Sequence, residues 1–445
     1  MNVVLVNPPL SSKYPTYISS KGAVDILHPP LGLALLAAVC ESNGHAVSML
    51  DLSTCPLEDN AFLHVLEGCR ADVVGITAMT STYPGALRYA RLAHEAGILT
   101  VIGGPHVTFA APHALATGWV DYVVFGEGEL TFLELLACLE EKADPRPVSG
   151  IAYQQGDALQ ISPPRPRMRD LDVLPLPAYH LLDMSEYVNV GALGTATSRG
   201  CPHTCGFCSN SRMWGHQVTF RSPRQVIHEL EHLITTYNYA GNQFSFYDDT
   251  FTLNQARALA ICSLMRERDM RLHWKCMTRV DNVNARLLEN MRAAGCYRVI
   301  FGIECVTNES LQRVDKGFTV DQAKHAVRLA RAAGLETEGY FIIGLPWQTR
   351  DDLMVTVHRL REFELDSVGL ALLTPYPGTS FYEQRIQWHL SVEDSDWERF
   401  TTLLPVVSTP HFSQRDLAEA FVTYLADYHF SESSIKDEGS EATAK

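Results

Sequence analysis

The sequence predicts an α/β chain of two successive parts: a doubly wound parallel sheet, then a partial barrel of six strand–helix units followed by a small helical region. Short apolar, β-branched runs alternate with segments of helical spacing in both parts, which is typical of parallel sheets covered by helices. A proline-rich stretch separates the two alternations. The chain has 445 residues, of which 46% are apolar, enough for about two or three buried cores.

The first 145 residues contain five predicted strand–helix units. Their strands are rich in Val, Ile and Leu, and turn signals such as Asn43-Gly44 end the helices. We expect these units to form a parallel sheet in the strand order 2-1-3-4-5. The strands are expected at 2–6, 46–50, 73–77, 99–102 and 122–125, and the helices at 31–42, 59–67, 84–96, 110–116 and 130–142.

Residues 146–190 are rich in proline, and Gln155-Gly156-Asp157 marks a hairpin tip, so a linker with one small hairpin is expected there. Six further units within 191–380 predict the partial barrel. Its strands are expected at 194–197, 243–247, 272–278, 298–303, 339–343 and 368–373, and its helices at 225–237, 254–268, 284–294, 320–333 and 350–364. Residues 381–430 are expected to form the C-terminal helical region, with a helix at 414–429, and residues 431–445 a disordered, solvated tail.

Charge and hydropathy exclude several classes of protein. The formal net charge of −15 argues against a nucleic-acid partner, because nucleic-acid binders need a basic face. The longest apolar run, residues 31–40, is too short for a membrane span, and the first residues lack the basic region of a signal peptide. These features predict a cytoplasmic protein whose eleven cysteines are thiols, metal ligands or redox groups.

Three of the cysteines, Cys201, Cys205 and Cys208, lie within one short loop directly after the first strand of the second part. A closed zinc site requires four ligands, and the other cysteines are too scattered to form a second knuckle. His203 lies inside the same loop, where its geometry as a fourth ligand is poor. Three thiolates with one open position suit an iron–sulfur cluster. The alternative is three unrelated cysteines on a surface turn.

The C-x3-C-x2-C spacing after the first strand of a partial barrel resembles the signature of the radical S-adenosylmethionine (radical SAM) superfamily. The resemblance implies a TIM-like (β/α)6 barrel in which Cys201, Cys205 and Cys208 hold a 4Fe-4S cluster. It also implies that the open iron binds S-adenosylmethionine and that reductive cleavage gives a 5′-deoxyadenosyl radical. Phe207, the aromatic residue before the last cysteine, is implied to pack near the adenine.

Further positions resemble the family's S-adenosylmethionine contacts at successive strand ends: Asp248, Arg279, Glu304, Gly344 and Pro375. The resemblance implies that Asp248 faces the amino end of the ligand, Arg279 its carboxylate and Glu304 the ribose. After Glu304 the family usually continues with Ser-Gly, whereas this chain continues with Cys-Val. A buried acid such as Glu304 can equally be a structural ion-pair partner.

The strand ends of the first part carry glycines, hydroxyls and amides, which suit a large flat ligand with a polar rim. A dinucleotide is poorly supported because no G-x-G-x-x-G turn is present, and a G-x-x-x-x-G-K-[ST] phosphate loop is also absent. The candidate binding residues are Asn7, Pro8, Thr77, Thr80, Ser81, Gly103, Gly104, His106, Val107, Thr108, Gly126, Glu127, Gly128 and Glu129.

These segments resemble the Rossmann-like cobalamin-binding domain that precedes the barrel in one branch of the radical SAM superfamily. The match includes the opening Asn-Pro-Pro, the Gly-Gly-Pro-His-Val-Thr loop and the Gly-Glu-Gly-Glu loop. The Asp-x-His-x-x-Gly motif that supplies a histidine beneath cobalt is absent, so the resemblance implies cobalamin without a protein histidine ligand. His106 is interpreted as a loop residue near the corrin. The alternative is a sheet that binds cobalamin weakly or serves only as a scaffold.

The resemblance implies that methylcobalamin donates a methyl group to a carbon radical on a small-molecule substrate. It also implies that two S-adenosylmethionines are consumed per turnover and that a flavodoxin- or ferredoxin-type one-electron reductant is needed. Ring formation or rearrangement with the same cofactors is an alternative, and so is a non-catalytic cobalamin or iron–sulfur sensor or carrier. A methylthiotransferase fits less well, because no second set of cluster cysteines is present.

Overall fold

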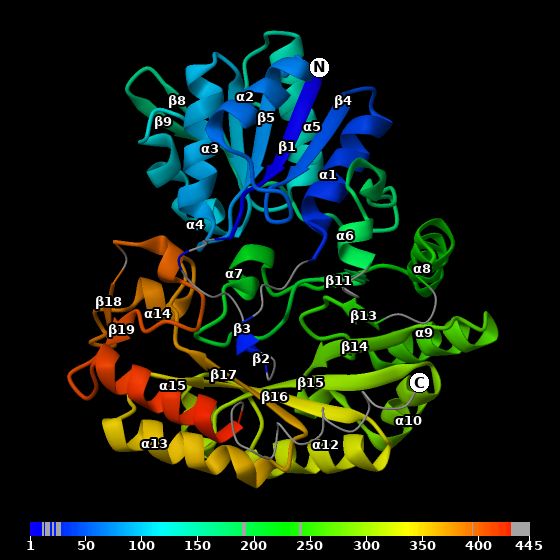
Figure 1. Ribbon diagram of the computed structural model, residues 1–445, viewed down its shortest axis with the longest axis vertical. Coiled ribbons are helices and arrows are strands. Elements are labelled where there is room, and N and C mark those ends of the chain that lie inside the picture. Colours follow the sequence, from blue (N-terminus) through cyan, green and yellow to red (C-terminus); the bar gives the residue numbers. More distant parts are fainter. Residues whose placement is uncertain are drawn as a thin grey trace, which may run out of the picture. The chain divides into compact units, whose positions relative to one another are not determined.

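The computed structural model describes residues 1–10, 13, 18–19, 22–23, 28–188, 193–239, 243–393 and 395–428. The chain divides into two compact units (Figure 1). The first unit contains the described residues within 1–11, 27–202 and 209–248, and the second those within 12–26, 203–208 and 249–445. The expected boundary between residues 190 and 191 lies outside the described residues. The expected tail at 431–445 lies outside the described residues.

The first unit is built on a mixed sheet whose central strands are parallel, in the order β4-β1-β5-β6-β7-β8-β9. The five parallel strands therefore follow the expected order 2-1-3-4-5. Val3, Val4, Leu5 and Val6 of β1 are all 0–1% exposed, because helices cover both faces of the sheet. The strands are β1 (Asn2–Asn7), β4 (Ala46–Asp51), β5 (Val73–Thr77), β6 (Leu99–Gly103), β7 (Tyr122–Val124), β8 (Ile151–Gln155) and β9 (Ala158–Ile161).

The helices of this sheet lie on its two faces, with α1 packed on α5 and α2 packed on α3 (Figure 1). Packing is tight enough that a Cβ on Gly75 of β5 would lie 2.8 Å from Leu5 Cδ2 and 3.4 Å from Phe132 Cζ. The bounds are α1 (Leu31–Ser42), α2 (Asp59–Gly68), α3 (Tyr83–Glu95), α4 (Pro105–Leu115) and α5 (Gly128–Glu140).

The segment expected to be a linker is part of the first unit. Its hairpin, β8–β9, adds two antiparallel strands to the edge of β7. Farther along, Leu171 and Leu174 form a small buried cluster with Val39 of α1. Burial of these leucines explains why the segment packs on the sheet's helices and does not extend into solvent.

The second sheet has six strands in the order β10-β13-β14-β15-β16-β17. β10 pairs in parallel with β13, and β14 to β17 pair in parallel with one another. The strands thus lie in the sheet in the order in which they occur along the chain. The strands are β10 (Leu193–Thr195), β13 (Gln243–Phe246), β14 (His273–Thr278), β15 (Cys296–Glu304), β16 (Glu336–Ile343) and β17 (Ser367–Leu372).

Helices follow these strands. Several of them begin at a polar residue whose side chain accepts a hydrogen bond from a backbone amide in the first turn. Thr319 and Thr349 each form a capping box with the third residue of the helix they start. In the second unit, α15 packs on α13 and β17, and the hydroxyl of Tyr424 donates to the Val368 carbonyl at 2.6 Å. The remaining helices are α6 (Ser185–Val188), α7 (Asn210–Trp214), α8 (Pro223–Tyr237), α9 (Gln255–Glu267), α10 (Ala285–Ala293), α11 (Asn308–Arg313), α12 (Val320–Ala332), α13 (Arg350–Arg359), α14 (Ser380–Glu383) and α15 (Gln414–Tyr428).

Short strand pairs complete the two units: β11 (Ser198–Arg199) with β12 (Thr219–Phe220), β18 (Ser391–Val392) with β19 (Val407–Ser408), and β2 (Ile18–Ser19) with β3 (Gly22–Ala23). Together the elements confirm the predicted α/β class, with a C-terminal helix after the last barrel strand. Within the described part of the chain, no helix is both long and apolar enough to cross a bilayer.

Candidate functional site

The carboxyl ends of the parallel strands in the first unit bring several predicted residues into one row. Asn7 is in register with Asp51 across β1 and β4, and Thr77 with Gly103 across β5 and β6. The Asn7 amide donates to Asp51 at 2.8 Å, and the Tyr187 hydroxyl donates to the same carboxylate. Ligands of doubly wound sheets bind at such strand ends, close to the point where the strand order reverses.

Gly103 and Gly104 form a close backbone contact with the neighbouring strand end. The Ala78 amide donates to the Gly103 carbonyl at 2.8 Å, and the His106 amide donates to the Ala78 carbonyl at 3.0 Å. Gly104 has φ +103°, and a Cβ there would lie 2.8 Å from the Ala78 nitrogen. The lack of side chains at Gly103 and Gly104 therefore lets this loop (residues 103–108, the diglycine loop) pack closely against residues 78–80, which include the exposed, apolar Met79.

A Gly104→Ala substitution is expected to weaken cobalamin binding, because the added methyl group would displace the 78–80 strand end that the diglycine loop packs against. Gly118→Ala is the matched control. Gly118 also has a positive φ, +74°, but nothing lies within 4 Å of its Cβ position. The Gly118→Ala variant therefore has the same kind of backbone strain as Gly104→Ala but no steric overlap. Equilibrium titration with cobalamin, followed by absorbance, measures the difference. Equal affinities of the two variants would contradict a role for the close approach.

His106 lies inside the first unit and not on the surface of the loop. Its ring is 1% exposed and 4.1 Å from the Tyr83 ring, and its Nδ1 is 3.2 Å from Thr80 Oγ1. Burial, with a smaller contribution from His113, lowers the pKa of His106 to about 4. The imidazole is therefore neutral near pH 7, and its place relative to cobalt remains a prediction.

The other residues predicted to contact cobalamin differ in burial: some lie in partly exposed loops and others in the core. Thr108 Oγ1 accepts from the Gly126 amide at 3.3 Å and donates to the Gly104 carbonyl at 2.9 Å, which joins two candidate loops. Ser81 is half-buried. Pro8 and Val107 are buried, and their contact with cobalamin remains a prediction.

The glutamates of the second candidate loop (residues 126–129, the acidic loop) are engaged within the protein. The Arg199 guanidinium contacts Glu127 at 3.3 Å and Glu129 at 2.5 Å. The other oxygen of Glu127 accepts from the Met168 amide at 2.6 Å. Both carboxylates are thus engaged with Arg199, which sequence reasoning missed, and their contact with a corrin remains a prediction. The glycines, Gly126 and Gly128, are half-buried.

The cysteine loop (residues 201–208) is a tight turn held at its centre by backbone contacts. The Cys208 amide donates to the Cys205 carbonyl at 3.0 Å. Gly206 donates to the Val314 carbonyl and accepts from the Phe381 amide, and a Cβ on Gly206 would lie 3.3 Å from the Phe381 ring. The Cys205 thiol lies 3.8 Å from the Asp315 carbonyl. These contacts define the shape of the loop.

The donor set of this loop fits an iron–sulfur cluster. All eleven cysteines are thiols, and soft thiolates are the ligands that such clusters require. Cys201 belongs to the first unit, whereas Cys205 and Cys208 belong to the second. Among the residues that the structure describes, no three His, Cys, Asp or Glu side chains are grouped as a metal site. The three thiols thus match the cluster by chemistry and spacing, and their joint ligation remains a prediction.

Asp248 does not present a free carboxylate. It is 1% exposed and accepts from the Thr197 amide at 3.0 Å and the Thr197 hydroxyl at 2.8 Å. The Ser198 hydroxyl donates to it as well. These bonds fasten the end of β13 to the turn that leads from β10 into β11. Contact between Asp248 and S-adenosylmethionine therefore remains a prediction, while its structural role is plain.

Arg279, predicted to face a carboxylate, is already paired. Its Nε and Nη2 donate to the two oxygens of Asp281 at 2.9 and 2.8 Å, and Nη2 also donates to the Lys316 carbonyl. The guanidinium lies 5.3 Å from the Phe318 ring centroid. Arg279 therefore fixes the backbone at Lys316.

Lys316, which sequence reasoning missed, forms a buried ion pair with Glu304 at 3.0 Å. Their side chains are 7% and 12% exposed, and Glu304 adopts φ +72° at a register shift of β15. Burial alone would lower the pKa of Lys316, but the charge and hydrogen bond of Glu304 raise it above its ordinary value. The ammonium lies 5.6 Å from the Phe207 ring centroid, which places a fixed positive charge beside the cysteine loop.

Gly344 and Pro375 shape loops at the ends of β16 and β17. Gly344 has φ +90°, and a Cβ there would lie 2.8 Å from Leu417 Cδ2 of α15. Its amide donates to the Gln348 side chain at 2.8 Å, and Pro375 is buried. Both residues pack within the second unit, and their contact with S-adenosylmethionine remains a prediction.

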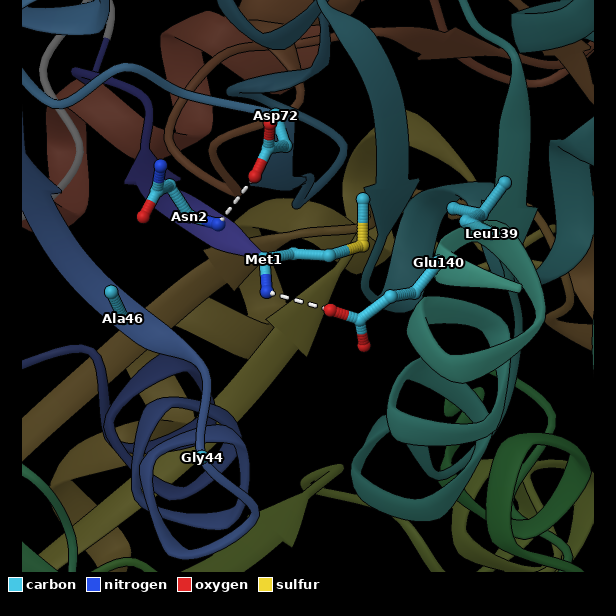
Figure 2. A pocket seen from close by; sticks show the side chains of 7 residues that line it. All are labelled: Met1, Asn2, Gly44, Ala46, Asp72, Leu139 and Glu140. Atoms are coloured by element: carbon cyan, nitrogen blue, oxygen red, sulfur yellow. Dashed lines mark hydrogen bonds and ion pairs between the residues drawn. The ribbon is translucent and has the colours of Figure 1, made fainter. Parts of the chain in front are cut away.

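A polar hollow of about 520 Å3 lies at the opposite, amino ends of β1 and β4 (Figure 2). There the Met1 amine pairs with Glu140 at 3.3 Å, and the Asn2 amide donates to Asp72 at 2.7 Å. Because these groups bind one another, we assign this hollow no ligand. It is lined by Met1, Asn2, Gly44, Ala46, Asp72, Leu139 and Glu140.

Comparison with known proteins supports both halves of the sequence interpretation. The B12 binding domain model matches residues 22–136, and the Radical SAM superfamily model matches residues 195–360. An uncharacterized methyltransferase of Pyrococcus horikoshii is 34% identical over 443 residues, covering 98% of this chain and 94% of the relative. The anaerobic magnesium-protoporphyrin IX monomethyl ester cyclase of Rubrivivax gelatinosus is 29% identical, covering 91% of this chain and 74% of the relative.

Two solved structures share the fold. The radical S-adenosylmethionine methyltransferase TsrM from Kitasatospora setae superposes with a TM-score of 0.77 at 18% identity, covering 95% of this chain and 90% of that one. The cobalamin-dependent enzyme OxsB gives 0.75 at 17% identity, covering 95% and 66%. With both family models matched and a full-length relative at 34% identity, the chain belongs to the cobalamin-binding branch of the radical SAM superfamily, as an enzyme that uses a 4Fe-4S cluster, S-adenosylmethionine and cobalamin.

Proposed function

We propose that this enzyme transfers a methyl group to an unactivated carbon of a small-molecule substrate. The observation that carries the proposal is the 34% identity, over 98% of the chain, to a relative named as a methyltransferase. A second relative, the cytidylyl-2-hydroxyethylphosphonate methyltransferase of Streptomyces wedmorensis, covers 90% of this chain at 25% identity. The proposal places residues 1–145 as the cobalamin-binding domain, 146–190 as a connecting segment, 191–380 as the radical SAM domain and 381–430 as the C-terminal region.

Cys201, Cys205 and Cys208 are the proposed cluster ligands. When bound, the cluster and S-adenosylmethionine supply the oxidant for a strong C–H bond, after reduction by an external one-electron donor, and cobalamin supplies the methyl group. The work of the chain is to position these groups and to exclude water, because an unactivated carbon offers no acid–base chemistry. The Val314 and Phe381 contacts on Gly206 serve that purpose at the cysteine loop.

Lys316 and Phe207 are the proposed S-adenosylmethionine contacts beside that loop, with Glu304 completing the charged pair. A carboxylate of the ligand is attracted to the buried ammonium, and the aromatic ring offers a flat surface to adenine. Asp248 and Arg279 act as positioning residues in this proposal, because their polar atoms are engaged with the protein. Gly344 and Pro375 shape the neighbouring loops.

Cobalamin is proposed to lie over the strand ends of the first unit. The support is the side-chain-free backbone of Gly103 and Gly104, the polar groups of Asn7, Thr77, Thr80, Ser81 and Thr108, and the exposed apolar Met79. No protein histidine is proposed beneath cobalt, because His106 is buried against Tyr83.

The test uses protein reconstituted anaerobically with iron, sulfide and cobalamin, then given S-adenosylmethionine and titanium(III) citrate. We expect 5′-deoxyadenosine from reductive cleavage, and S-adenosylhomocysteine equal to the bound cobalamin from methylation of the reduced cofactor. Absence of deoxyadenosine while the cluster is intact would overturn the enzyme assignment and favour a sensor or carrier.

A radical cyclase is the second candidate, because three relatives named as anaerobic magnesium-protoporphyrin IX monomethyl ester cyclase cover 91–92% of this chain at 27–29% identity. The same assay separates the two activities. A cyclase forms deoxyadenosine without accumulating S-adenosylhomocysteine, whereas a methyltransferase forms both.

A further inference from the structure

Arg199 joins the acidic loop of the cobalamin-binding domain to the strand that leads into the cysteine loop. Its guanidinium bridges Glu127 and Glu129, at 3.3 and 2.5 Å. Two residues farther along the chain is Cys201. All of these residues belong to the first unit, so the bridge lies within one compact body.

The bridge is buried. The side chains are 15% exposed for Arg199 and 7% for both Glu127 and Glu129. Glu127 and Glu129 lie at the N-terminus of α5, where the helix dipole favours negative charge, and Glu127 also accepts from the Met168 amide. A planar guanidinium can contact two carboxylates at once, which a lysine ammonium cannot match in geometry. The arrangement therefore fixes the position of the Arg199 side chain.

The backbone of Arg199 is held equally firmly. Arg199 pairs with Thr219 between β11 and β12, and Arg167 donates to the Arg199 carbonyl at 3.1 Å. The following residue, Gly200, has φ +101°, and a Cβ there would lie 2.5 Å from the Gln217 carbonyl. The backbone from Arg199 to Cys201 is consequently held by contacts at Arg199 and at Gly200. A displacement of Arg199 would therefore displace the Cys201 thiol.

We propose that Arg199 is a positioning residue that sets the place of the Cys201 thiolate by fastening β11 to the acidic loop. The inference rests on the proposed role of Cys201 as a cluster ligand. It assigns Glu127 and Glu129 to the support of the cluster site and not to contact with the corrin. Residues that orient metal ligands commonly change metal affinity by about 10- to 100-fold when they are removed.

The test compares Arg199→Met with Arg165→Met. Arg165 is a matched control: it is also 15% exposed, donates to Thr131 and pairs with Glu134 of the same helix α5, but it lies outside the cysteine loop and its supports. The reconstituted proteins are challenged anaerobically with an iron chelator, and cluster loss is followed by absorbance. We expect about tenfold faster loss from Arg199→Met than from Arg165→Met.

Two milder variants keep the test decisive if Arg199→Met does not fold. Arg199→Lys retains the charge and Glu129→Gln retains the shape, and each is expected to accelerate cluster loss by about threefold or more. Thermal unfolding of the cluster-free proteins and the electron paramagnetic resonance spectrum of the reduced cluster are recorded alongside. The proposal expects an altered cluster spectrum in the Arg199 variants, which a general loss of stability would not produce.

Cluster loss at the Arg165→Met rate in all three variants, with unchanged spectra, would overturn the positioning role. A Cys201→Ala protein separates that failure from a failure of the ligand assignment. If Cys201→Ala retains a full, spectroscopically normal cluster, the assignment of Cys201 as a ligand is wrong. If it loses the cluster while the Arg199 variants behave like the control, only the positioning role is wrong.

Discussion

A Cys208→Ala variant is expected to lose the iron–sulfur absorbance while retaining cobalamin. One of three thiolates is removed, and the remaining two cannot hold a cluster in the required geometry. The proposed cobalamin site, by contrast, consists of strand ends of the first unit, whereas Cys208 belongs to the second. Iron and sulfide analysis, with cobalamin quantified by chromatography, measures the two cofactors separately, and deoxyadenosine formation is expected to fall to background.

Cys55→Ala is the control for this experiment. Cys55 is an exposed thiol in the loop after β4, so its removal tests the effect of losing a cysteine outside the cysteine loop. We expect unchanged iron content and activity. Loss of cobalamin together with iron in Cys208→Ala would contradict two separate cofactor sites.

A Lys316→Met variant is expected to be strongly destabilised and to bind S-adenosylmethionine weakly. Removal of one partner leaves the Glu304 carboxylate buried without its counter-charge, which typically costs about 3–5 kcal/mol in the free energy of unfolding. Urea unfolding of the cluster-free protein measures this cost. Titration of the reconstituted protein with S-adenosylmethionine measures the loss of ligand affinity.

Two further variants separate the effect of Lys316 on stability from its effect on S-adenosylmethionine binding. Lys324→Met breaks a more exposed pair with Glu362 and is expected to cost about 1 kcal/mol or less. The double variant Lys316→Met/Glu304→Gln removes both charges and is expected to recover much of the stability without recovering ligand affinity. Full ligand affinity in the double variant would show that the pair is structural only.

Sequence patterns predicted the elements well where burial is repeated along the segment. The strand expected at 73–77 is observed as β5 (Val73–Thr77), and the helix expected at 31–42 as α1 (Leu31–Ser42). The hydrophobic pattern of such a segment is enough to predict the element, because its side chains all lie in the same apolar environment. The edge position of β8 and β9 was not predictable in this way, since it depends on pairing with β7 and not on the hairpin's own sequence.

The position of the candidate loops at strand ends was predictable, but the distant partners of their charged side chains were not. Strand ends with glycine and hydroxyl residues mark a binding edge by topology alone. Arg199, by contrast, lies 70 positions after Glu129, and Lys316 pairs with Glu304, which lies on the other side of helix α11 in the sequence. Nothing local to Glu129 or Asp248 distinguishes a carboxylate that binds a ligand from one that pairs with another side chain of the protein.

The antiparallel hairpin also has a bearing on self-association. An unpaired outer strand offers a row of N–H and C=O groups to another chain, and β9 carries Ile161, which is 57% exposed. Yet β9 has only four residues, and Pro163 and Pro164 follow soon after it. Proline lacks the N–H that a growing ladder requires. This side of the molecule is thus protected from strand recruitment by a second copy.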